Sequence, residues 1–128
     1  MIIEAARLAD GTEPVWEYLD PLMKSRRRGG ENLRRMADIV VVLDDFASTG
    51  ILEVPRELNY LRDDIWEIKA GDARLPFFYV NDQRHGAAAR ITSGFTKRQE
   101  ETPAKQINKA LWIRREDLAW DNERGESQ

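Results

Sequence analysis

Three short apolar runs separated by turn residues lie in the second half of the chain, and they constrain the fold more than any other feature. The run "IWEIK" (65–69) alternates between apolar and polar side chains, and "RLPFFYV" (74–80) and "AAARITSGF" (87–95) follow it. The dipeptides GD (71–72) and ND (81–82) between the runs favour tight turns. Strands that are so close together in the chain pair with their neighbours, so the sequence predicts an antiparallel meander.

Helical patterns lie on both sides of this predicted sheet. In "ENLRRMADIVVVLDDFASTG" (31–50) apolar side chains recur three and four residues apart, and Gly50 is a natural C-terminal cap. The face that we expect this helix to bury consists of Leu33, Met36, Ala37, Val40, Leu43 and Phe46. Thr102 as cap and Pro103 as first residue open a last helix. Its expected packing face consists of Ile107, Ala110, Leu111 and Leu118.

The N-terminal third is less regular. Ile2 and Ile3 favour a short strand, and residues 14–22 favour either two short helical pieces or one helix kinked at Pro21. The order of elements predicts an α+β fold, in which N-terminal helices pack on a small antiparallel sheet that is followed by a C-terminal helix. A chain of 128 residues accommodates one domain, which we place at residues 1–120, with 121–128 as a polar C-terminal tail.

Composition excludes several kinds of site. The chain has no cysteine, so disulfides, thiolate catalysis and cysteine zinc sites are excluded, and its single histidine, His85, excludes a histidine-rich metal centre. We therefore predict no metal and no cofactor. No run of about 18 apolar residues exists, and the N-terminus is too acidic for a signal peptide, so we expect a cytoplasmic protein without a membrane partner.

Charge is unevenly distributed along the chain, although the net charge is only −3. Residues 36–67 carry two positive and eight negative side chains, whereas residues 84–109 carry six positive and two negative ones. The basic residues in and around the meander are Lys69, Arg74, Arg84, Arg90, Lys97 and Arg98. They either solvate a sheet face and pair with the acidic helix, or they form an anion-binding surface. No pair of carboxylates at catalytic spacing, glycine-rich phosphate loop or serine nucleophile elbow accompanies them.

Four segments resemble, in order, the landmarks of one protein family: "TEPVWEYLDPL", "FASTGILEVPRELNYLRDDIWEIK", "RLPFFYV" and "ITSGFTKRQEETP". The last segment is the most specific, because five of its residues fall at the spacing of the family's motif: Gly94, Phe95, Lys97, Thr102 and Pro103. Through nearly its whole length the chain resembles the phage-derived, HigB-like branch of the RelE/ParE superfamily of type II toxins.

The resemblance implies N-terminal helices packed against a twisted antiparallel sheet, and an endonuclease that cleaves messenger RNA on the ribosome. In such toxins the RNA's own 2′-hydroxyl attacks the adjacent phosphate, clustered cations neutralise the developing charge, and no metal is needed. The implied partners are a cognate helix-turn-helix antitoxin, the ribosome and messenger RNA. Operator DNA is reached only through the antitoxin.

Catalytic residues are carried over from the family by position. Arg74 aligns with the strand arginine that contacts phosphate, Lys97 and Arg98 align with two lysines of the motif, and Lys69 aligns with the basic residue at a strand end. The side chains expected to bind RNA are Arg84, His85, Arg90 and Tyr79, although an aromatic residue in a strand also serves as core.

Three further positions of the motif carry expectations. Gly94 and Phe95 are expected to be structural, the first through a close backbone approach and the second as a core anchor. Ser93 replaces the usual histidine, so any acid–base role of that histidine is absent or falls to His85.

Two other functions stay open. A ParE-like protein shares the sheet but inhibits DNA gyrase by binding, without nuclease activity. An inactive relative would only capture a partner helix on an apolar groove.

Overall fold

The computed structural model describes residues 1–24, 30–82 and 86–126. Arg84 and His85 lie outside the described residues. The elements in chain order are β1 (Ile2–Ala5), α1 (Trp16–Met23), α2 (Glu31–Thr49), β2 (Leu58–Arg62), β3 (Ile65–Ala70), β4 (Ala73–Asp82), β5 (Gly86–Ile91), β6 (Phe95–Thr96) and α3 (Ala104–Glu126). None of the described helices is long and apolar enough to cross a membrane.

The strands form one sheet in the order β1-β5-β4-β3-β2, with the two-residue strand β6 paired to β4. The predicted meander is confirmed, because β3, β4 and β5 pair antiparallel with their neighbours in sequence. The prediction of a wholly antiparallel sheet is wrong, because β1 pairs parallel to β5. The strand predicted at 87–95 is also shorter than expected. It ends at Ile91, and the chain pairs again only at β6.

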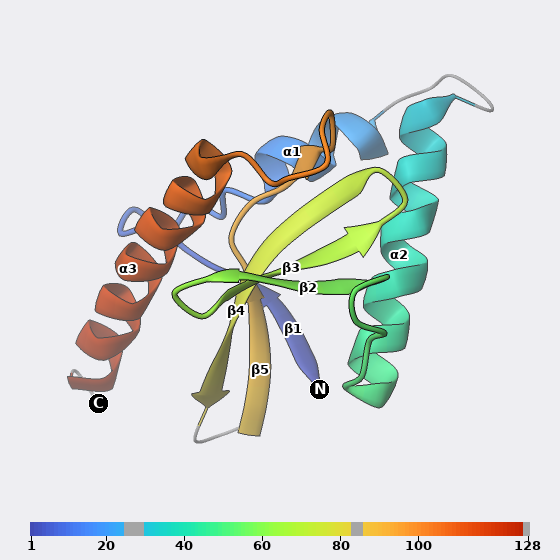
Figure 1. Cartoon of the computed structure of the whole chain (residues 1–128). Helices are drawn as coiled ribbons and strands as arrows, with labels where there is room; N and C mark the ends of the chain where they lie inside the picture. The colour runs from blue at the N-terminus through green and yellow to red at the C-terminus, as the bar shows by residue number, and fades with distance from the viewer. Residues whose placement is uncertain (25–29, 83–85, 127–128) are drawn as a thin grey trace.

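Helices cover both faces of the sheet (Figure 1). Helices α1 and α2 pack on one face, where Leu19, Ile39 and Phe46 meet Ile68 and Phe77 in the larger core. Helix α3 packs on the other face, in a smaller core formed by Ala6, Ile65, Phe78, Ala110 and Ile113. Helix α3 covers only part of this second face. At the end where β3 and β4 join in a hairpin, the segment that precedes α3 lies next to the sheet instead.

The buried faces of two helices differ from those predicted. In α2, Ile39 is fully buried whereas Val40 is 53% exposed, and Leu33 is also exposed. Phe46, Met36 and Leu43 pack in the core as predicted, so the predicted face is correct in part. The continuous apolar run 39–43 offers several faces, and spacing alone chose Val40 instead of Ile39. In α3, the inward positions are Ala110, Ile113 and Asp117, and Leu118 is exposed.

The helix ends also refine the predictions. Gly50 caps α2 in the left-handed conformation, as predicted, and its N–H donates to the Phe46 carbonyl. Helix α1 is one helix that contains Pro21. Helix α3 begins at Ala104 rather than Pro103, and it continues through residues 121–126, which were expected to form a tail.

Candidate functional site

Two basic side chains face each other across the β3–β4 hairpin. Lys69 and Arg74 are directly opposite in the antiparallel register. Their strand neighbours Ile68 and Leu75 point into the larger core. Because successive side chains of a strand point to opposite faces, Lys69 and Arg74 point to the face on which α3 packs. Like charges directly opposite each other destabilise a sheet. This hairpin end therefore accepts an unfavourable pair, which is a pattern expected of a binding site rather than of a structural one.

The Arg74 guanidinium is held in place by its own hairpin. Its Nη1 donates to the Gly71 carbonyl at 2.7 Å and to the Ala73 carbonyl at 2.9 Å. The residue is only 8% exposed, and the described residues provide it with no carboxylate partner. Arg74 is thus a positioned cation whose charge is not neutralised by an ion pair.

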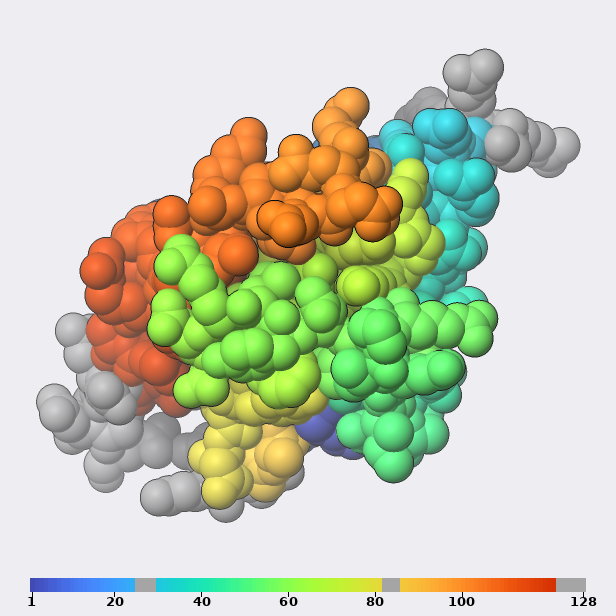
Figure 2. Space-filling view, in the orientation of Figure 1, coloured from blue at the N-terminus to red at the C-terminus, as the bar shows by residue number. Residues whose placement is uncertain are grey.

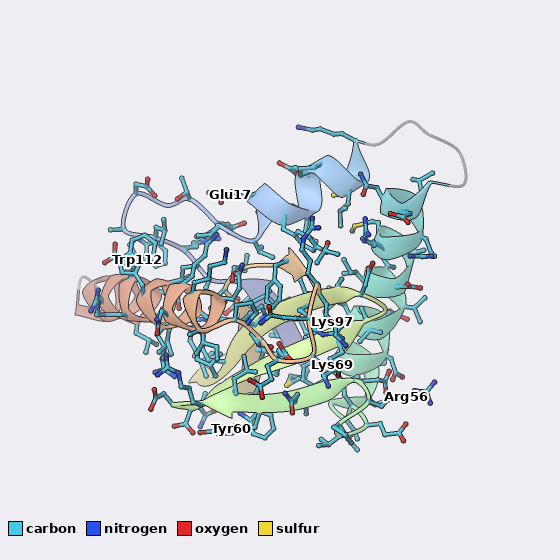
Figure 3. The ribbon with its side chains drawn as sticks, turned by 45° about the horizontal axis from the view of Figure 1, so that its top comes forward. Glu17, Arg56, Tyr60, Lys69, Lys97 and Trp112 are labelled. Atoms are coloured by element: carbon cyan, nitrogen blue, oxygen red, sulfur yellow. The ribbon has the colours of Figure 1, made fainter. Side chains whose placement is uncertain are left out.

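The segment 94–103 brings more cations to this hairpin. Phe95 in β6 pairs with Arg74, and the Lys97 N–H donates to the Asp72 carbonyl at 2.7 Å. Lys97 and Lys69 lie close to each other (Figure 3), and both line the same hollow, which is described below. The space-filling view shows the same segment covering the hairpin, between α3 and α2 (Figure 2). The basic pair 97–98 is therefore anchored to the turn that also orients Arg74.

An ion pair from α2 fixes that turn. Arg35 donates from Nε to Asp72 Oδ1 at 2.9 Å and from Nη2 to Oδ2 at 3.0 Å. The hydrogen bond from Arg35 is the main cause that lowers the pKa of Asp72 below its ordinary value of 3.8, against a smaller opposing effect of burial. Asp72 thus binds Arg35 through its carboxylate and Lys97 through its carbonyl.

Asp72→Asn is expected to lower stability at neutral pH. A carboxylate with a lowered folded-state pKa stabilises the fold above its unfolded value, and that stabilisation is lost as the pH falls through the folded value. The difference between the wild type and Asp72→Asn should therefore shrink as the pH falls from neutral through 3.8 and then through the lower folded-state pKa. Urea midpoints across this range measure the effect, with Asp44→Asn, an exposed aspartate, as control. A difference that is independent of pH would contradict the prediction.

Two adjoining hollows lie beside this cluster, and Arg74 and Lys97 line both. The large hollow has a volume of about 550 Å³, and its charged lining residues are Arg74, Lys97, Arg98, Glu100, Glu101 and Lys105. The small hollow has a volume of about 280 Å³, and its charged lining residues are Glu67, Lys69, Arg74, Lys97, Glu100 and Glu101. All four residues predicted to be catalytic are thus brought together: Lys69, Arg74, Lys97 and Arg98.

Glu67 is a site residue that the sequence analysis did not identify. It is only 2% exposed, yet it lines the small hollow. Its Oε2 accepts the Thr102 hydroxyl at 2.7 Å, and its Oε1 accepts the Asn59 amide at 3.5 Å. Thr102, predicted as a helix cap, therefore connects the start of α3 to this carboxylate. One signal was available, because Glu67 and Lys69 are two residues apart on one face of a strand.

Tyr18 closes the large hollow on the α1 side. Its hydroxyl lies 3.0 Å from Thr96 Oγ1, and burial raises its pKa above the ordinary value. The ring packs directly on the backbone of Gly94, where a Cβ atom would lie 2.3 Å from Tyr18 Cδ2. The predicted close approach at Gly94 is confirmed. Phe95 is only half-buried and lines the large hollow, so it is not the core anchor that was expected.

Arg90 does not join the cluster. Its guanidinium forms ion pairs with Glu4 at 2.8 Å, Asp117 at 2.7 Å and Asp121 at 3.3 Å, and its side chain is 8% exposed. Burial alone would lower the pKa of Arg90, but the hydrogen bonds and charges of Glu4, Asp117 and Asp121 outweigh it and raise the pKa. Arg90 connects β5 to β1 and α3, and the expectation that it binds RNA is replaced by a structural role.

The other predicted RNA-binding residues are also apart from the cluster. Tyr79 lies on the opposite face of the sheet, where its ring packs edge-on against Phe46, Trp66 and Phe77. Burial raises the pKa of its hydroxyl. Arg84 and His85 lie outside the described residues. Ser93 is buried and lines neither hollow.

This arrangement can bind a polyanion, because four cations line two adjoining hollows and a buried carboxylate lines one of them. Such a site stabilises negative charge that develops on a phosphate, and the carboxylate can accept a proton. No protein-family model matches the chain, and no curated protein matches it. The resemblance to the HigB-like toxins therefore stays a prediction.

Proposed function

We propose that this protein is the toxin of a type II toxin–antitoxin system and that it cleaves messenger RNA on the ribosome. One observation carries the proposal: Lys69, Arg74, Lys97 and Arg98, from a hairpin and a distant segment, line two adjoining hollows beside the buried Glu67. A backbone phosphate is the ligand that suits several converging cations.

The cations have different roles in this proposal. Arg74, held by the Gly71 and Ala73 carbonyls, is pre-positioned for a non-bridging oxygen of the scissile phosphate. Lys97 lines both hollows and completes the charge around the same phosphate. Lys69 and Arg98 each line one hollow, so they suit the phosphates on either side.

The proposed reaction uses groups on the RNA and the protein alone. The 2′-oxygen forms a bond to the adjacent phosphorus while the bond from phosphorus to the 5′-oxygen breaks. Glu67 accepts the proton of the 2′-hydroxyl, and Lys97 supplies a proton to the departing 5′-oxygen. Glu67 suits this role better than Glu100 or Glu101, because two hydrogen bonds hold it whereas the other two carboxylates are exposed.

The same charges suggest how the protein is silenced. Apart from a weak pair between Lys97 and Glu100 at 3.9 Å, no salt bridge of the described residues neutralises the four cations. An acidic segment of a helix-turn-helix antitoxin would neutralise them and occupy the hollows. The protein would then reach operator DNA only through that antitoxin.

The test is a reaction of purified protein with ribosomes and messenger RNA. We expect fragments that end in a 2′,3′-cyclic phosphate and begin with a 5′-hydroxyl, together with growth arrest when the chain is expressed without its antitoxin. Intact RNA combined with blocked DNA supercoiling by gyrase would identify a gyrase inhibitor instead. Intact RNA without growth arrest would identify an inactive relative.

A further inference from the structure

The solvent face of α3 carries a stripe of cations around a tryptophan. Lys105, Lys109, Trp112 and Arg115 recur at intervals of three or four residues and therefore lie on one side of the helix. We refer to these four residues as the α3 stripe. Asp117 and Asp121 of α3 are held on the inner side by Arg90, so they do not neutralise the stripe. Glu116 lies on the same side of the helix as the stripe, four residues after Trp112, so this side carries three cations and one carboxylate.

Trp112 is the central residue of the stripe. Its side chain is 44% exposed, although tryptophan is normally well buried. Lys109 precedes it by one turn, and Arg115 follows it by about one turn. An exposed aromatic ring between cations is the arrangement that binds single-stranded nucleic acid, because the ring stacks on a base while the cations contact the phosphates.

The stripe is continuous with the candidate site. Lys105 lines the large hollow together with Arg74, Lys97 and Arg98. From Lys105 to Arg115 the helix advances about 15 Å, at about 1.5 Å per residue. Figure 3 shows Trp112 on α3, on the side of the helix that lies toward α1 and away from Arg56.

The ion pair between Lys109 and Glu17 of α1 does not block the stripe. Lys109 Nζ lies 3.8 Å from Glu17 Oε2, and the Glu17 side chain is largely exposed. Exposed ion pairs of this kind contribute little, so a phosphate can replace the carboxylate at Lys109.

We propose that single-stranded RNA that leaves the large hollow follows the α3 stripe. Lys105, Lys109 and Arg115 contact successive phosphates, and one base stacks on Trp112. The inference rests on the proposed function, because the RNA that follows the α3 stripe must be the RNA that the large hollow binds. It adds a second binding region outside the reacting centre, with single-stranded RNA as its ligand.

The experiment measures binding of a trinucleotide and a 12-nucleotide RNA that are fully 2′-O-methylated and therefore cannot be cleaved. Fluorescence anisotropy should show that Trp112→Ala weakens the 12-nucleotide complex about tenfold and leaves the trinucleotide complex unchanged. Lys109→Ala should reduce the slope of log affinity against log salt by about 0.7 for the longer RNA. Trp112→Phe should retain most of the affinity, because phenylalanine also stacks.

Tyr79→Ala and Arg56→Ala are the matched controls, because they remove an equally exposed aromatic ring on the opposite face of the sheet and an exposed cation that lines neither hollow. Neither should change the affinity for either RNA. Wild-type affinity of both Trp112→Ala and Lys109→Ala for the longer RNA would overturn the inference. The inference would also be overturned if these two variants kept their affinity for RNA but no longer bound the antitoxin. The α3 stripe would then be a protein interface. Because the RNA cannot react, failure of the nuclease proposal would leave these affinities as expected.

Discussion

Arg74→Ala is expected to lower the rate of RNA cleavage by about 10²- to 10³-fold, the loss seen when one positioned donor to a developing negative charge is removed. The reason is the placement of Arg74, which lines both hollows while its own hairpin carbonyls hold its guanidinium. Growth arrest on expression should be relieved to the same degree. Quantitative cleavage of messenger RNA on ribosomes, with fragments resolved by length, measures the rate.

Arg74→Lys separates the charge of Arg74 from the geometry of its guanidinium, and Arg56→Ala is the control. Arg74→Lys keeps the charge without the planar fork, so it should retain more activity than the alanine variant but less than the wild type. Arg56→Ala removes an exposed arginine that lines neither hollow, and it should cleave at the wild-type rate. The thermal midpoint is measured alongside each rate. A folded Arg74→Ala protein that cleaves at the wild-type rate would exclude Arg74 from the site.

Arg90→Met is expected to reduce the free energy of unfolding by about 3–5 kcal/mol, because it removes one partner of a buried ion pair. Asp117 is even more buried than Arg90, and its other oxygen accepts the Arg7 N–H at 2.9 Å. Without the guanidinium, the Asp117 carboxylate would be left buried and unpaired. Chemical denaturation at neutral pH measures the loss.

A second substitution tests the cause of that loss. Asp117→Asn combined with Arg90→Met removes the stranded charge and keeps an oxygen for the Arg7 N–H, so the double variant should be more stable than Arg90→Met alone. At a temperature at which it is folded, it should also cleave RNA at nearly the wild-type rate. Unchanged stability of Arg90→Met, or loss of cleavage in the folded double variant, would restore Arg90 to the RNA-binding residues.

Local patterns predicted much of the fold. Alternation and turn residues identified β3 and β4, and Gly50 located the end of α2. Strand β2 was missed because Leu58–Arg62 is a short edge strand of mixed polarity that pairs with β3 alone. The parallel pairing of β1 with β5 could not be predicted, since strand direction depends on contacts between distant parts of the chain.

The contrast between local patterns and distant contacts also explains which site residues could be predicted from the sequence. Arg74, Lys97, Arg98 and Lys69 were identified through a resemblance, and the structure brings them together. Arg90 looked similar in the sequence, but its partners Glu4 and Asp117 are 86 and 27 residues away. A basic residue that binds RNA and one that is held by distant carboxylates cannot be told apart from their immediate neighbours.

The most direct test of the proposed reaction is to remove the attacking group from the RNA. The cleavage position on a ribosome-bound messenger is first mapped, and the nucleotide that supplies its 2′-hydroxyl is then replaced by the 2′-deoxy form. We expect cleavage to be lost at that position, while binding and cleavage elsewhere continue. Cleavage at an unchanged rate at the 2′-deoxy position would contradict the proposed reaction.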